Sequence, residues 1–168
     1  MIEVRKAEAE DIPTILEIYA KAKKYMREHG NPNQWSPTYP SREDISSDIE
    51  RSMLYLITDD GTAVAVFVFT LNEEKAYRII DGKWTQNEYY GTLHRIASNG
   101  LRKGILRIAI TYALNFVPYI RIDTHHDNAT MKNALLSYGF NECGRVYYTR
   151  NGEKTERIAF DYKRNSYL

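Results

Sequence analysis

The sequence has few of the residues that mark specialised classes of chain. It holds a single cysteine, Cys143, which excludes an intrachain disulfide and a cysteine-cluster metal site. With nine glycines and five prolines in 168 residues, no segment has the composition of a low-complexity or disordered tract. No run of about 18 apolar residues is present for a membrane span, and residues 1–6 lack the apolar core of a signal peptide. We therefore expect a cytoplasmic protein with no membrane partner.

An excess of charge of one sign is also missing. Lysine and arginine number 23 and the acidic residues 22, so the formal net charge is +1. Binding to a nucleic-acid backbone normally leaves a basic footprint, so nucleic acid is not an expected partner, although one local basic pocket for a phosphorylated cofactor remains compatible with this balance. The hydrophobic residues, at 43%, supply the core of one domain, which we expect to span residues 1–168.

Hydrophobic periodicity and turn residues predict an ordered series of helices and strands. Ser41 and Asp44 form the pattern of a capping box at the start of the second helix, and Asp60-Gly61 predicts a hairpin. Residues 73–90 are polar and aromatic, and we expect a further strand there at Ala76–Ile80. The predicted strands are 2–6, 53–58, 62–71, 91–98, 119–124, 146–149 and 156–162, and the predicted helices are 11–29, 41–50, 103–116 and 128–138.

The order of these elements predicts an α/β protein with a mixed sheet. The strand–helix–strand unit in the second half requires a parallel crossover, whereas the hairpins require antiparallel pairing elsewhere. We expect helices on the flanks of this sheet. In the helix at 103–116 the spacing points Ile105, Ile108, Ala109, Tyr112 and Phe116 inward.

A short turn between a strand and a helix has the features of a phosphate-binding site. In the run Asn99–Ile105 the strand ends, a glycine-bearing loop follows and a helix begins. Such a junction directs unpaired backbone N–H groups and the positive end of the helix dipole at one point, where a pyrophosphate fits. Arg102 and Lys103 add charge, and Gly104 permits a close approach of the backbone. By itself this pattern is also common in plain connections.

Four motifs in order resemble the GNAT superfamily of acetyl-CoA-dependent N-acetyltransferases. They are Val4-Arg5-Lys6-Ala7 with Asp11-Ile12, then His94-Arg95-Ile96-Ala97, then Arg102-Lys103-Gly104-Ile105, and finally Asn128 with Gly139-Phe140. The resemblance covers nearly the whole chain. It implies the GNAT fold, in which a central, largely antiparallel mixed sheet has splayed fourth and fifth strands and is flanked by helices.

The resemblance also implies acetyl-CoA, or a related acyl-CoA, as the cofactor. The pantetheine arm would pair with the backbone of Ile96, Ala97 and Ser98 on the splayed strand. The pyrophosphate would lie on the N–H groups of Arg102, Lys103, Gly104 and Ile105, and Asn128 would hydrogen-bond the pantetheine or diphosphate. Dimers are frequent in the family, so a homodimer is one expected assembly.

The sequence departs from the family pattern at three positions. With Gly104 placed on the first glycine of the loop motif, Leu101 stands at the usual Gln or Arg and Leu106 at the usual final Gly or Ala. The tyrosine that often protonates the departing thiolate, four residues before the Gly-Phe pair, is here Leu135.

Three residues are candidates for proton transfer. His94 is the candidate base, because its strand borders the thioester and its titration range suits the task; the alternative is a strand histidine bonded within the sheet. The two-residue period of a strand places its neighbour Arg95 on the opposite face. Asp123 is a second candidate base or amine ligand, unless it belongs with His125 and His126 to a solvated turn. Tyr138 is a candidate acid, with packing against the sheet as the alternative.

Aromatic residues in two loop-like segments are candidates for the substrate wall. Trp35, Tyr39 and Trp84, with Tyr89 and Tyr90 beside the last of these, suit a cationic amine or an apolar side chain, and core packing is the equal alternative. No metal site is expected, because His125 and His126 have no further ligands at helical spacing.

Two functions are consistent with these residues. The first is an N-acetyltransferase that moves an acetyl group directly from acetyl-CoA to the primary amine of a small molecule or peptide. The second is an acyl-CoA-binding module that has lost transfer chemistry, an alternative motivated by Leu135. Modification of a protein amine is a variant of the first.

Overall fold

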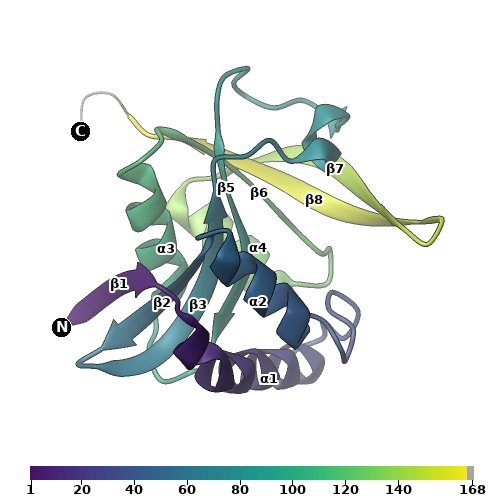
Figure 1. Ribbon diagram of the computed structural model, residues 1–168. Helices are drawn as coiled ribbons and strands as arrows, with labels where there is room; N and C mark the ends of the chain where they lie inside the picture. Colours follow the sequence, from purple (N-terminus) through teal and green to yellow (C-terminus); the bar gives the residue numbers. More distant parts are fainter. Residues whose placement is uncertain (166–168) are drawn as a thin grey trace.

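A single eight-stranded sheet runs through the molecule in the computed structural model, which describes residues 1–165 (Figure 1). Its strand order is β1-β2-β3-β5-β6-β8-β7-β4, and only β5 and β6 are parallel neighbours. The strands are β1 (Ile2–Lys6), β2 (Leu54–Asp59), β3 (Thr62–Thr70), β4 (Asp81–Gly82), β5 (Gly91–Ser98), β6 (Tyr119–Thr124), β7 (Asn141–Arg150) and β8 (Glu153–Lys163). The predicted mixed, largely antiparallel sheet is thus confirmed.

Two helices cover each face of this sheet. The helices are α1 (Ile12–Glu28), α2 (Arg42–Glu50), α3 (Ile105–Leu114) and α4 (Ala129–Tyr138), and no helix within residues 1–165 is long and apolar enough to cross a membrane. Successive side chains of a strand point to opposite faces. Accordingly Leu54 and Leu56 of β2 pack with α1 and α2, whereas Tyr55 and Ile57 pack with α3 and α4. The result is a three-layer arrangement with a hydrophobic core on each side of the sheet (Figure 1).

The two central strands part soon after they meet. β5 and β6 pair only at Gly91 with Ile120 and at Thr92 with Arg121. Beyond Thr92 the strands diverge, so the β6-facing edge of β5 is open along the rest of its length, up to the loop before α3. The expected splay is confirmed, and it forms a slot in the middle of the sheet.

A β-bulge interrupts β5 beside this slot. The register with β3 passes from Val66 opposite Ala97 to Val68 opposite His94, so one residue of β3 faces two of β5. Arg95 has a φ of 48°, in the left-handed region that side-chain-bearing residues seldom adopt. A bulge bends its strand and redirects the side chains next to it.

Two sequence expectations are corrected by the fold. Ala76–Ile80 is not a strand, because Lys75–Arg78 form a 3₁₀ turn that the Glu74 side chain caps by accepting the N–H of Ala76. A two-residue strand follows instead, at Asp81–Gly82, where Gly82 and Gly144 bring the backbones of β4 and β7 so close that a Cβ on Gly144 would lie 2.1 Å from a carbonyl oxygen.

The helix at 103–116 is also shorter than expected. It begins at Ile105, because Gly104 adopts a left-handed φ of 78° as the N-cap residue, and it ends at Leu114. Phe116 therefore lies beyond the helix, and at 57% exposed it does not point inward. The capping box of Ser41 and Asp44 is confirmed at the start of α2.

Candidate active site

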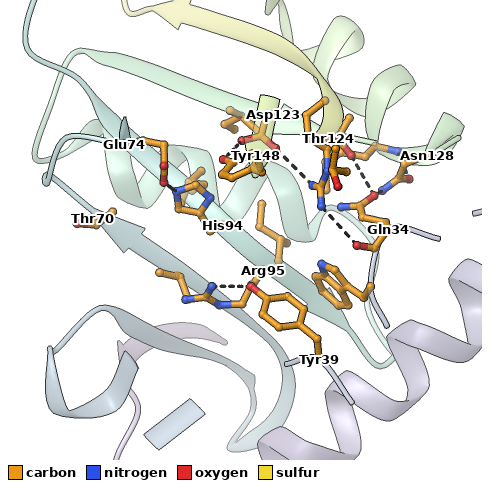
Figure 2. Close-up of a pocket in the computed structure, with 18 of the residues that line it drawn as sticks. Gln34, Tyr39, Thr70, Glu74, His94, Arg95, Asp123, Thr124, Asn128 and Tyr148 are labelled. Atoms are coloured by element: carbon orange, nitrogen blue, oxygen red, sulfur yellow. Dashed lines mark hydrogen bonds and ion pairs between the residues drawn. The ribbon is translucent and has the colours of Figure 1, made fainter. Parts of the chain in front are cut away.

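A cavity of about 530 Å³ opens where β5 and β6 diverge (Figure 2). Its walls come from the loop at 33–39, the ends of β3 and β6, the segment at 72–74, and the outer parts of β7 and β8. A volume of this size is typical of a pocket for a small molecule. The cavity therefore marks the place where the slot in the sheet meets several polar side chains.

Four consecutive residues of β5 line this cavity. They are Leu93, His94, Arg95 and Ile96. Strict alternation along a strand would have sent Arg95 to the face opposite His94, and this expectation is wrong, because the bulge at Arg95 breaks the two-residue period.

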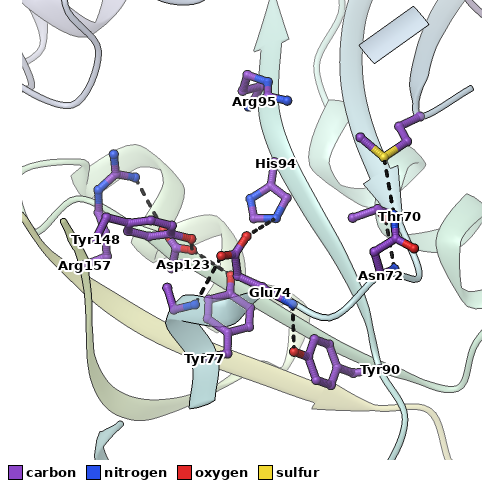
Figure 3. Close-up of polar contacts among 12 residues, drawn as sticks. Thr70, Asn72, Glu74, Tyr77, Tyr90, His94, Arg95, Asp123, Tyr148 and Arg157 are labelled. Atoms are coloured by element: carbon purple, nitrogen blue, oxygen red, sulfur yellow. Dashed lines mark hydrogen bonds and ion pairs between the residues drawn. The ribbon is translucent and has the colours of Figure 1, made fainter. Parts of the chain in front are cut away.

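The imidazole of His94 faces the carboxylate of Glu74 (Figure 3). Nε2 of His94 lies 3.6 Å from Oε2 of Glu74, and the two side chains are 21% and 26% exposed. Burial lowers the pKa of His94, although Asp123 and Glu74 act in the opposite direction. The ring is therefore neutral near pH 7 and able to accept a proton, and a carboxylate stands beside it to stabilise the charged form.

Two hydrogen bonds hold Glu74 in place. Its Oε1 accepts the backbone N–H of Ala76 at 3.2 Å, and its own N–H donates to the hydroxyl of Tyr90 at 3.1 Å. Tyr90 in turn packs against the guanidinium of Arg121. These contacts fix the carboxylate against His94, a pairing that no sequence signal announced.

Asp123 is buried and fully engaged rather than solvated. Its carboxylate, 3% exposed, accepts hydrogen bonds from the hydroxyls of Tyr77 (2.7 Å) and Tyr148 (2.6 Å) and pairs with the Arg157 guanidinium at 3.4 Å. Burial and the nearby Asp123 charge raise the pKa of both tyrosines, so their hydroxyls stay protonated. The solvated-turn alternative is wrong for Asp123, and these contacts occupy the acceptor sites that a base would need.

Tyr39 and Trp35 form the aromatic wall opposite. Trp35 is 9% exposed and its ring meets Tyr39 edge-on at 6.4 Å between centroids. The Tyr39 hydroxyl accepts from Arg95 at 2.7 Å (Figure 2). The same guanidinium donates to both carboxylate oxygens of Asp48 at 2.7 Å. Arg95 thus reaches the cavity with its charge already compensated.

The loop before α3 presents unpaired backbone groups. The N–H groups of Gly100 and Leu101 are bonded within the loop, to Ser98 Oγ and Asn99 Oδ1 at 3.0 Å each. The N–H groups of Ile105, Leu106 and Arg107 lie in the first turn of α3, where intrahelical partners are lacking, and those of Arg102, Lys103 and Gly104 come just before it. Arg102 also pairs with Asp59 at 3.0 Å, and Lys103 is exposed. This geometry can hold an anionic group.

Other predicted cofactor contacts are placed as follows. Ile96 lines the slot, Ala97 is buried against the α1 side, and Ser98 is half-buried at the end of β5. Asn128 lines the cavity, where its Oδ1 caps α4 through the N–H of Met131 (3.1 Å) and its amide donates to Gln34 at 3.0 Å.

Two predicted site residues lie outside the cavity. Trp84 packs against Tyr77 and Arg121 in a separate cluster and donates from Nε1 to the Tyr77 carbonyl at 3.1 Å. Tyr138 packs with aromatic residues at the far end of α4, including Tyr162, with 5.1 Å between their ring centroids, and Arg107 stacks on its other side. Trp84 is therefore not placed to form a substrate wall, nor Tyr138 to act as the thiolate acid, because both side chains pack against other residues outside the cavity.

A small histidine cluster follows β6. His125, His126 and Asp127 bring one ligand atom each within 4.8 Å of one another, so the sequence argument, which looked for further ligands at helical spacing, did not consider the adjacent Asp127. Nδ1 of His125, however, already accepts the backbone N–H of Asp127 at 3.1 Å, and the two imidazole rings stack at 4.2 Å. We assign no metal to this turn.

Related proteins are found by comparison of structures but not by comparison of sequences. No family model matches the sequence, and no curated protein does. Among solved structures, an acetyltransferase of the GNAT family from Streptococcus agalactiae 2603 superposes with a TM-score of 0.86 and 26% identity, over 98% of this chain and 96% of that one.

More distant structures share the fold. A GNAT-family acetyltransferase from Listeria monocytogenes 4b F2365 has a TM-score of 0.69 and 22% identity, covering 96% of this chain and 94% of its own. The protein yncA from Salmonella typhimurium, solved with its cofactor acetyl-CoA, has a TM-score of 0.60 and 12% identity, covering 98% and 95%. The expected GNAT fold is confirmed.

Proposed function

Since the chain is a small member of the GNAT superfamily, we propose that it transfers an acetyl group from acetyl-CoA directly to the primary amine of a small molecule or peptide. One observation carries this proposal. The slot between β5 and β6 leads from the unpaired N–H groups before α3 to a neutral, partly buried His94 in a cavity. A diphosphate at one end of the slot and an amine at the other would be joined by a pantetheine-length arm.

The cofactor's place follows from the free backbone groups. The N–H groups from Arg102 to Ile105 would hold the pyrophosphate, with Lys103 supplying charge. The open edge of β5 at Ile96 and Ser98 would pair with the pantetheine arm, and Asn128 stands where the slot meets the cavity. The binding of acetyl-CoA by yncA supports this assignment through the shared fold.

The chemistry needs a base and a polarising group from the protein. Bound acetyl-CoA supplies an activated thioester. His94 would accept the proton that the amine loses, and the Glu74 carboxylate at 3.6 Å would stabilise the imidazolium that forms. A backbone N–H beside the bulge, near Ile96 or Ala97, would donate to the carbonyl oxygen as negative charge develops on it. Asp123 would act at a distance, through its charge.

Replacement of His94 tests the assignment. In a coenzyme A release assay over a panel of amines, His94→Gln should lower kcat by about 10² to 10⁴-fold, the usual contribution of a positioned base. Acetyl-CoA affinity should be unchanged. His29→Gln is the matched control, because His29 is exposed and stacks on Tyr25 away from the cavity.

The binding-module alternative rests on Leu135. That side chain is 0% exposed and Tyr138 lies outside the cavity, so neither offers an acid to a thiolate. Tight acetyl-CoA binding by calorimetry, combined with no turnover of any amine in the panel, would favour the module and overturn the transferase.

A further inference from the structure

Two arginines at the rim of the cavity differ from the arginines inside it. Arg95 is paired with Asp48 at 2.7 Å and Arg157 with Asp123 at 3.4 Å, so their charges are compensated. Arg51 and Arg150 also line the cavity and are exposed, yet within residues 1–165 no carboxylate lies at ion-pairing distance from either. These two guanidinium groups are therefore free to bind a ligand.

Arg150 is positioned by the aromatic wall. Its guanidinium carbon lies 4.7 Å from the centroid of the Tyr39 ring, a cation–π geometry that holds the charge beside the cavity without neutralising it. Arg150 is one of the groups that lower the pKa of Asp44, but the Asp44 carboxylate already accepts hydrogen bonds from the N–H and hydroxyl of Ser41, at 2.8 and 2.9 Å.

The acidic groups of the cavity gather elsewhere. Glu74 stands beside His94, and Asp123 pairs with Arg157 (Figure 3). Glu73 pairs with Arg78 at 2.6 Å. The segment at 73–74 and the Tyr39–Arg150 contact belong to different walls, and Figure 2 shows Glu74 with His94 apart from Tyr39. The cavity is thus polarised, with the Glu74 carboxylate and a neutral base at one wall and the uncompensated guanidinium of Arg150 at another.

We propose that the acceptor is a small amine that also carries a carboxylate. Its amino group would face His94 and Glu74, and its carboxylate would face Arg150, with Arg51 contributing charge at the rim. Arginine is suited to this task because its planar fork matches a carboxylate. The same cations would repel polyamines and lysine-rich peptides. This inference rests on the transferase function proposed above and narrows its substrate.

Amines of matched basicity test it. The panel pairs 5-aminopentanoate with pentylamine and with 1,5-diaminopentane. We expect kcat/KM to be at least about tenfold higher for the carboxylate-bearing member of a pair, since one hydrogen bond to a charged group commonly supplies that factor. Equal or faster turnover of the neutral amine or the diamine would overturn the inference and leave the transferase intact.

Variants of single arginines test whether Arg150 causes the preference for carboxylate-bearing amines. Arg150→Gln should raise KM for the carboxylate-bearing amine about tenfold and leave the neutral partner unchanged, with partial recovery in Arg150→Lys. Arg42→Gln removes an exposed arginine that does not line the cavity and should change neither value. An equal effect of Arg42→Gln would show that only overall charge matters and would refute the site.

A binding readout separates this inference from the transferase. Saturation-transfer NMR should detect 5-aminopentanoate on the wild-type chain with acetyl-CoA present, and the signal should be lost in Arg150→Gln. That outcome without any release of coenzyme A would support the anion site while overturning the transferase. Absence of the signal in the wild-type chain would overturn the anion site.

Discussion

Two glycines in the loop before α3 allow the cofactor site to be tested without confusing binding with folding. Gly100 and Gly104 have φ values of 84° and 78°, and in each case no atom lies within 4 Å of where a Cβ would be. Alanine at either position therefore meets no steric clash, and its cost is that of the left-handed conformation, roughly 1–2 kcal/mol. Both variants should melt a few degrees below the parent, by a similar amount.

The two variants should differ in affinity for acetyl-CoA. The N–H of Gly100 is already bonded to Ser98 within the loop, whereas Gly104 lies among the N–H groups left free at the helix start. A methyl group at 104 stands in the approach of a phosphate and should remove about one hydrogen bond to a charged group, roughly 1.5–3 kcal/mol. Gly104→Ala should thus weaken binding about 10- to 150-fold, and Gly104→Arg should abolish it.

Calorimetric titration with acetyl-CoA, run beside thermal melts, makes the comparison. The expected result is a large loss for Gly104→Ala and little change for Gly100→Ala at the same melting temperature. Equal losses in both variants would show that loop strain governs binding. Unchanged affinity in Gly104→Ala would place the phosphates elsewhere.

Two further predictions concern the base and the segment that supports it. Burial lowers the pKa of His94 below its ordinary value near 6.5, and only the neutral ring accepts a proton, so kcat/KM should fall as the pH drops through that lowered pKa. Glu74→Gln removes a carboxylate that raises the pKa of His94, so in a pH–rate profile it should move the acid limb to lower pH. An acid limb that stays in place would exclude Glu74 as the partner of His94. Asp161 is 0% exposed and accepts from the Tyr119 hydroxyl at 2.6 Å and from the N–H and hydroxyl of Thr85 at 2.7 and 2.8 Å. In a denaturant titration, Asp161→Ala should lower the free energy of unfolding by roughly 3 kcal/mol or more, and Asp161→Asn should lower it by less. Equal effects of the two variants would show that these donors find other acceptors.

The parts of the fold that were predictable are those with a strong period or a local cap. The strands Gly91–Ser98 and Tyr119–Thr124 have the expected bounds, since β-branched and aromatic runs ended by turn residues leave little ambiguity. Asn128 caps α4 and Ser41 caps α2, both through short-range contacts that the sequence displays directly.

The bulge in β5 could not be read from residue types. Arginine has no preference for a φ of 48°, so Arg95 gives no warning that the alternation fails there. The conformation is imposed by contacts from distant elements, namely the pairing of Arg95 with Asp48 and the donation from the Tyr19 hydroxyl to its carbonyl at 3.1 Å. The direction of side chains at the site therefore depended on tertiary structure.

The polar partners of the site were hidden for the same reason. Glu74 stands 20 positions before His94 in the sequence, and it reaches the imidazole only because the segment at 73–90 is anchored to the sheet by β4 and by Asp161. Tyr148 and Arg157 come from the last two strands, where no motif marks them. Trp84, by contrast, was predicted as a site residue because it lies in a loop-like segment, but it packs in a hydrophobic cluster instead.

Leu135 bears on how the departing thiolate is handled. Its side chain is wholly buried in the core with Phe140, so this position contributes packing and offers no acid. Two tyrosines line the cavity: the Tyr39 hydroxyl accepts from Arg95, and the Tyr148 hydroxyl donates to Asp123. Burial and the Asp123 carboxylate raise the pKa of Tyr148, which makes it a poor acid. The thiolate of a thioester is already a much better leaving group than an alkoxide or an amide anion. Because a general acid usually contributes only about 10² to 10⁴-fold, its loss slows transfer without preventing it, and the open cavity lets water supply the proton.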